Sequence, residues 1–218
     1  MENAFGLKPV KPRERIITTA RDLFRKHGIR GVGVDAIAEA AGTNKMTLYR
    51  HFGSKDELVC ECLRDFAREV EGYWQELEGE YPGDPVAQLR EWVRCGAECM
   101  NTDDGRGCDM ANAAVELADD DHPARQVIEE FKNKQRNRLV ELARDGGITQ
   151  PELLADTLCL LLEGARVSIQ SVGKEGPGAH FIASVDAVIA SFRRGIDEKK
   201  PAVKPAGGKA KARVAASA

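Results

Sequence analysis

A short stretch in the first quarter of the chain carries the side chains best suited to binding chemistry. Leu48 and Phe52 are four positions apart, so they share one face of a predicted helix. The remaining face presents cations, hydroxyls and an aromatic ring, from Lys45, Met46, Thr47, Tyr49, Arg50 and His51. Cations and hydroxyls can hold phosphate oxygens, and side chains at the start of such a helix can reach base edges in the major groove. This face therefore indicates binding to DNA.

A second short helix must position that face. The segment from Asp35 to Ala41 carries Ile37 and Ala38 on its inner side, and Gly42 follows it. Small alanines let two helices approach closely, and glycine permits a left-handed turn between them. The pattern predicts a helix-turn-helix, although an ordinary helical hairpin would show the same spacing.

Longer helices surround this unit. The first ends at Gly28 and has an apolar face formed by Ile16, Ile17, Ala20, Leu23 and Phe24. Ser54 and Glu57 form a predicted capping box, which starts a long helix that runs to about Glu78. Further helices are predicted near 85–101, 107–118, 122–145, 151–172 and 179–196, and Thr149 with Glu152 forms a second predicted capping box. No apolar and polar alternation argues for a sheet, so the expected class is all-α with about nine helices.

The charge is divided along the chain. Residues 1–55 carry a net charge of +6, residues 56–196 carry −13 and residues 197–218 carry +4. A basic head on an acidic body suits a protein whose head meets a polyanion. We therefore expect a DNA-binding domain over 1–55, a linking helix over 56–83, a further helical domain over 84–196, and a disordered basic tail over 197–218 that could add non-specific DNA affinity.

Other classes of function find little support. The six cysteines match no zinc-binding spacing, and without a secretory signal a disulfide framework is not expected. No apolar run is long enough to span a membrane, so a cytoplasmic location is expected. The chain has no glycine-rich phosphate loop, nucleophile elbow or His-Glu-x-x-His motif, which argues against an enzyme. His51 has no second metal ligand at helical spacing, so neither a metal nor a cofactor is expected.

The segment from Arg15 to Leu58 resembles the DNA-binding domain of the TetR (tetracycline repressor) family. The resemblance rests on Ile37-Ala38, Ala41-Gly42, Thr47-Leu48-Tyr49, His51-Phe52 and Ser54-Lys55-Asp56-Glu57-Leu58. It implies a three-helix DNA-binding domain followed by a helical ligand-sensing and dimerisation domain over 84–196. It implies a DNA surface formed by Gly33, Thr43, Asn44, Lys45, Met46, Thr47, Tyr49, Arg50, His51 and Lys55.

Within that surface we expect two kinds of contact. Base edges are assigned to Lys45, Met46, Thr47 and Arg50, and phosphates are assigned to Tyr49, His51 and Lys55. Gly33 stands where the family commonly has Ser or Thr, and it offers no hydroxyl to a phosphate. Lys11, Arg13 and Arg15 could also reach phosphates, or could form a solvated charged face.

The resemblance also implies partners. A homodimer is expected through the last two helices, at about 151–172 and 179–196, so that two recognition helices meet an inverted-repeat operator in double-stranded DNA. The expected function is a repressor released by an unidentified small molecule, with an activator or a ligand-independent regulator as the alternative. The predicted ligand-binding residues, each of which could instead be plain core, are Trp92, Cys95, Cys99, Met100, Met110, Asn112, Val115, Glu116, His122 and Phe131. Cys95 and Cys99 with Cys108 could alternatively form a thiol sensor or a soft-metal site.

Overall fold

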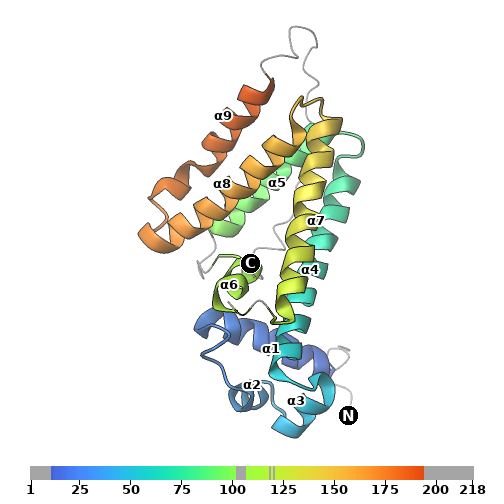
Figure 1. The fold of residues 1–218 in the computed structure, drawn as a ribbon, viewed down its shortest axis with the longest axis vertical. Coiled ribbons are helices and arrows are strands. Elements are labelled where there is room, and N and C mark those ends of the chain that lie inside the picture. The colour runs from blue at the N-terminus through green and yellow to red at the C-terminus, as the bar shows by residue number, and fades with distance from the viewer. Residues whose placement is uncertain (1–10, 102–106, 118, 120, 194–218) are drawn as a thin grey trace, which may run out of the picture. The chain divides into compact units, whose positions relative to one another are not determined.

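The structure is a computed structural model that describes residues 11–101, 107–117, 119 and 121–193. Within these residues the chain is entirely helical, with nine α-helices, one short 3-10 helix and no strand (Figure 1). The helices are α1 (Pro12–His27), α2 (Val34–Ala40), α3 (Lys45–Phe52), α4 (Lys55–Glu80), α5 (Pro85–Met100), α6 (Asp109–Glu116), α7 (Ala124–Asp145), α8 (Pro151–Val172), η1 (Pro177–His180) and α9 (Phe181–Arg193). The predicted all-α class is confirmed. None of the described helices is long and apolar enough to cross a membrane.

The contacts between residues divide the chain into two compact units. The first unit contains the described residues of 1–66 and 112–128, and the second contains those of 67–111 and 129–218. Three helices, α4, α6 and α7, contribute residues to both units. The predicted basic tail, residues 197–218, and the predicted last helical residues 194–196 lie outside the described residues.

The first unit is built on the packing of α1, α2 and α3. Its buried core contains Ile16, Ile17, Ala20, Val32, Ile37, Ala38, Ala41, Leu48, Phe52, Leu58 and Cys62. The turn after α2 closes by two backbone bonds, from the Thr43 amide to the Ala38 carbonyl at 2.9 Å and from the Gly42 amide to the Glu39 carbonyl at 3.0 Å. This pattern is a Schellman motif, and it needs the left-handed backbone that Gly42 adopts at φ +61°.

The two predicted capping boxes have different outcomes. The Ser54 hydroxyl accepts from the Glu57 amide at 3.0 Å, as predicted, but the Ser54 amide donates to the Phe52 carbonyl rather than to Glu57. The second box is wrong, because α8 begins at Pro151 after Gln150, with no side-chain cap. A residue before proline is disfavoured in the helical region, so Gln150 cannot be the first helical residue after a Thr149 cap.

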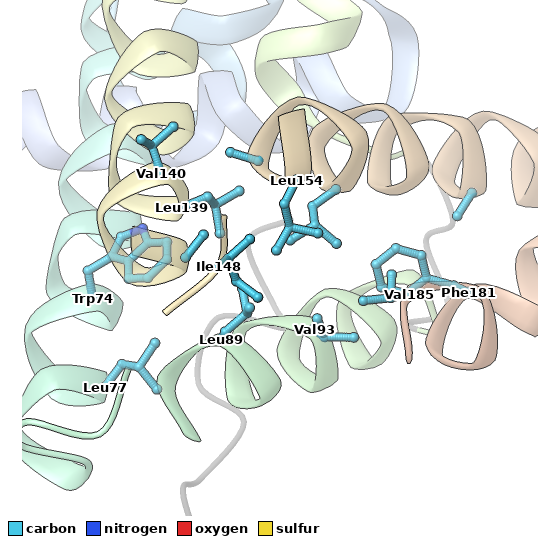
Figure 2. Packing of buried hydrophobic residues seen from close by; sticks show 14 of the residues in the cluster. Trp74, Leu77, Leu89, Val93, Leu139, Val140, Ile148, Leu154, Phe181 and Val185 are labelled. Atoms are coloured by element: carbon cyan, nitrogen blue, oxygen red, sulfur yellow. The ribbon is translucent and has the colours of Figure 1, made fainter. Parts of the chain in front are cut away.

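The second unit has its own core, formed where α4, α5, α7, α8 and α9 converge. Figure 2 shows this core and labels Trp74, Leu77, Leu89, Val93, Leu139, Val140, Ile148, Leu154, Phe181 and Val185. The buried indole of Trp74 donates to Gln135 of α7 at 2.6 Å, which satisfies its polar atom. Gly96 lets α5 approach its neighbours, because a Cβ there would lie 3.1 Å from the Leu162 side chain.

Candidate nucleic-acid interface

The two faces of α3 divide as the sequence predicts. Leu48 is fully buried and Phe52 nearly so, and both belong to the core of the first unit. Met46 is 78% exposed on the other face. Tyr49, Arg50 and His51 are also exposed, which leaves a row of polar and cationic side chains directed away from that core. The helix therefore has the amphipathic division that a groove-binding helix requires.

The start of α3 is stabilised by its own cap. The side-chain oxygen of Asn44 accepts a hydrogen bond from the Thr47 amide at 2.9 Å. Asn44 therefore fixes the first turn of α3. Sequence reasoning placed Asn44 in the DNA surface and missed this capping role. Thr43 and Thr47 are half-buried beside it. Gly33 caps α2 at φ −85° with no side-chain bond, as expected for a residue without a hydroxyl.

Two of the predicted DNA-contacting lysines have partners within the chain. The Lys45 ammonium lies 3.1 Å from an Asp35 carboxylate oxygen, and this hydrogen bond raises the pKa of Lys45. Both groups are solvent-exposed, so a phosphate could replace the carboxylate at little cost. The Lys55 ammonium donates to the Ile29 carbonyl at 2.7 Å and is half-buried, so it holds the loop before α2.

The arginines of α1 also serve the fold. Arg13 forms an ion pair with Glu61 of α4, and its guanidinium carbon lies 5.4 Å from the centre of the Phe52 ring. The Arg15 Nε donates to the Ala41 carbonyl at 3.1 Å, next to the turn of the motif. Sequence reasoning left phosphate contact open for both residues and missed these structural contacts, because they join positions that are distant in the chain.

The ten predicted ligand-binding residues are divided between the two units. Four of them, Asn112, Val115, Glu116 and His122, belong to the first unit. Val115 is 81% exposed, and a Glu116 carboxylate oxygen accepts from the Arg30 amide at 3.1 Å. His122 accepts from the Ala124 amide through Nδ1 at 3.1 Å, and its Nε2 lies 3.5 Å from an Asp56 carboxylate oxygen, so both ring nitrogens contact groups of the same unit.

The other six predicted ligand-binding residues belong to the second unit. Trp92, Cys95 and Cys99 lie on one face of α5, and Phe131 is half-buried on α7. Met100 and Met110 are buried. A groove of about 560 Å³ lies on another side of α5, against α9, and contains none of the ten. Its lining residues are Val86, Leu89, Arg90, Val93, Arg94, Ile182, Asp186, Ile189 and Ala190.

Comparison with known proteins extends these observations. Residues 16–62 match the family described as bacterial regulatory proteins, tetR family. The chain is 26% identical over 152 residues to the HTH-type transcriptional repressor KstR2 of Mycolicibacterium smegmatis, a match that covers 68% of this chain and 73% of that protein. It is 39% identical over 67 residues to the HTH-type transcriptional repressor AcnR of Corynebacterium efficiens, covering 31% of this chain and 36% of that protein.

Solved structures give the same result over more of the chain. SCO4454, a TetR-family transcriptional regulator from Streptomyces coelicolor, has a TM-score of 0.77 at 26% identity, and the match covers 83% of this chain and 95% of that one. A putative TetR-type regulator from Streptomyces avermitilis has a TM-score of 0.66 at 28% identity, covering 84% of this chain and 98% of that one. The likeness therefore extends well beyond residues 16–62.

Proposed function

The chain belongs to the TetR family of bacterial regulatory proteins, and on that premise we propose that it is a transcriptional repressor that binds an inverted-repeat operator as a homodimer and is released by a small molecule. The relatives described above are regulators of transcription rather than enzymes, and the same applies to this chain. The single observation that carries the proposal is the division of α3 into a buried apolar face and an exposed cationic face.

The proposed DNA surface combines direct contacts with supporting ones. Met46, Thr47, Arg50 and Lys45 are proposed to contact bases, while Tyr49 and His51 are proposed to contact phosphates. We give Asn44 and Lys55 a supporting role in addition, since their polar groups bind the Thr47 amide and the Ile29 carbonyl. Gly33 and Thr43 complete the surface at the ends of α2 and of its turn.

A stripe of exposed apolar side chains on α8 supports the proposed dimer. Leu153, Leu160 and Val167 recur every seven residues and are 52%, 74% and 57% exposed in the single chain. Residues seven apart lie almost in line along a helix, so the three form a continuous strip. Helix α9 packs beside α8 (Figure 1) and has one exposed large apolar side chain, Ile182, which lines the groove against α5. Burial of such a strip against a second copy would remove it from water.

A charge placed on this strip tests the dimer. We expect Leu160→Glu to give a monomer, because the new carboxylate would be buried without a partner in the interface. Val115→Glu is the matched control, since Val115 is an equally exposed apolar residue on α6. Sedimentation velocity separates the two states. A Leu160→Glu protein that remains dimeric would remove α8 from the proposed interface.

The small-molecule effector and the cellular location of the protein are also proposals, which rest on the family and on the composition of the chain. The effector site is proposed to lie in the second unit, among Trp92, Cys95, Cys99, Met100, Met110 and Phe131. We propose that the protein acts in the cytoplasm, where bacterial operator DNA is found.

Selection from a pool of random duplex DNA tests the proposed function directly. The purified chain is expected to enrich an inverted repeat with two equal half-sites. The Tyr49→Ala/Arg50→Ala double variant should enrich no sequence, because it loses both a phosphate contact and a base contact. Enrichment of the same repeat by wild type and double variant, or no enrichment by wild type, would contradict the proposal.

A further inference from the structure

A carboxylate of α2 touches the face of α3 that is proposed to meet DNA. Asp35, in the first turn of α2, accepts a hydrogen bond from the Lys45 ammonium through Oδ2 at 3.1 Å. Lys45 is the first residue of α3. In a helix-turn-helix the N-terminal residues of the second helix contact base edges. Because the two charged groups are in direct contact, the Asp35 carboxylate reaches the groove wherever the Lys45 ammonium does.

Both charged groups are open to solvent on that face. The side chains of Lys45 and Asp35 are 48% and 74% exposed. Their mutual bond is the only ion pair that either side chain forms with a residue that the structure describes. A carboxylate on a DNA-contacting face repels phosphates. It therefore lowers affinity for every sequence, unless it also makes a contact that only some sequences offer.

The spacing of the two groups matches the major-groove edge of one G·C pair. Guanine presents its O6 and N7 there as acceptors, and cytosine presents its N4 amino group as a donor. The guanine O6 and the cytosine N4 are hydrogen-bonded to each other in the pair, so they lie about 3 Å apart. The Lys45 ammonium and the Asp35 Oδ2 are 3.1 Å apart. The ammonium can therefore donate to guanine while the carboxylate accepts from cytosine of the same pair.

Other base pairs fit these two groups less well. An A·T pair also presents an acceptor, thymine O4, beside a donor, adenine N6, but a methyl group flanks the thymine O4. Guanine instead has N7 as a second acceptor beside O6, which suits an ammonium with three donors and no acceptor. In the reversed pair, C·G, the cytosine amino group faces the ammonium and the guanine O6 faces the carboxylate, so both contacts are repulsive.

We propose that Asp35 and Lys45 act as one unit that selects a G·C pair in each half-site of the operator, with the Lys45 ammonium on guanine and the Asp35 carboxylate on the cytosine amino group. The inference rests on the proposed function, which assigns Lys45 to base contact. It adds a specificity-determining residue from α2 that is not among the ten residues assigned to the DNA surface. The bond to Asp35 also orients the Lys45 ammonium before DNA binds, which lowers the cost of ordering its side chain.

Binding to operators with single base changes tests the unit, with the duplex enriched by the wild-type protein as the parent. Asp35→Ala should reduce the preference for G·C at one position of each half-site by about tenfold, within the discrimination of one good base contact. Lys45→Ala should reduce the preference at the same position. The losses should not add in the double variant, because both groups read one base pair. Each preference is a ratio of two affinities of one preparation, so a partly unfolded sample does not alter it.

Glu39→Ala is the matched control. Glu39 is an exposed carboxylate on the same helix, one turn after Asp35, and it forms no ion pair with a residue that the structure describes. Its removal should leave every base preference unchanged. Asp35→Ala should also bind a random duplex more tightly than wild type does, because it removes a negative charge from beside the phosphates.

Several results would overturn the unit. Asp35→Ala could keep every base preference of wild type, or could change a different position from the one that Lys45→Ala changes. Tighter binding to random duplex could be absent, which would mean that the carboxylate does not face DNA. A shared position that prefers A·T would refute the selection of G·C. Failure of the wild-type protein to enrich an inverted repeat would instead contradict the proposed function.

Discussion

Arg50 carries the sharpest prediction at the scale of single residues. Its guanidinium is exposed on α3 and forms no ion pair with any other residue that the structure describes. A bidentate contact from arginine to guanine contributes about 1–3 kcal/mol of discrimination against other bases. We therefore expect Arg50→Ala to relax the preference at one base pair of each half-site. Binding to a set of operators with single base changes measures this.

The control for Arg50 must remove the same charge from the same unit. Lys26→Ala does so, because Lys26 is an exposed cation in the last turn of α1. It should leave the base preference unchanged. If Arg50→Ala weakens binding to every operator variant by the same factor, Arg50 contacts phosphate rather than a base.

Sequence reasoning predicted which residues of α3 are buried. It did not predict the contacts that Lys45 and Lys55 make within the chain. Leu48 and Phe52 could be assigned to the core because spacing alone fixes the face of a helix. The contacts of Lys45 with Asp35 and of Lys55 with the Ile29 carbonyl depend on how separate elements pack. Periodicity within one helix contains no information about such packing.

Substitution of glycine by alanine at two positions tests how the helices are built, because the free energy of unfolding should fall at one position and rise at the other. Gly42→Ala should destabilise the protein by about 1–2 kcal/mol, since an L-residue is strained at the φ of +61° that ends α2. Gly72→Ala should stabilise it by up to about 1 kcal/mol, because Gly72 lies inside α4 and alanine favours helix. An added Cβ meets nothing within 4 Å at either site, so clashes do not enter.

Urea unfolding measures both glycine variants, with Gly33→Ala as a third comparison. Gly33 also has open space around it, but its φ of −85° is accessible to any residue. We expect Gly33→Ala to cost no more than about 1 kcal/mol through the weaker cap. A Gly42→Ala protein as stable as wild type would mean that the turn between α2 and α3 does not need its left-handed residue.

The two predicted capping boxes differ in one residue type that determines whether the predicted helix start is correct. The hydroxyl of Ser54 caps α4, because nothing in the following residues opposes a helix start at Lys55. Thr149 has the same spacing to Glu152, yet Pro151 excludes Gln150 from the helix and moves the start of α8. The capping pattern was the same in both places, and the intervening proline changed the outcome.

Over the whole molecule, charge and apolar exposure point to two different partners. The net charge of +6 over residues 1–55 favours a polyanion, whereas the −13 over residues 56–196 disfavours one there. The apolar strip on α8 lies within the acidic part, where a second copy is the proposed partner. Sequence reasoning identified α8 and α9 as the apolar pair but could not separate the inward residues from Leu160 and Val167, since these helices are apolar on more than one face.

The central claim is that the exposed face of α3 enters the groove of DNA, and site-specific photocrosslinking tests it most directly. A photoreactive phenylalanine analogue replaces Met46, which is 78% exposed on α3, or Val115, which is 81% exposed on α6. The account predicts that position 46 crosslinks to two symmetric positions, one in each half-site of the selected operator, and that position 115 does not crosslink. Bound protein that crosslinks from position 115 but not from position 46 would contradict it.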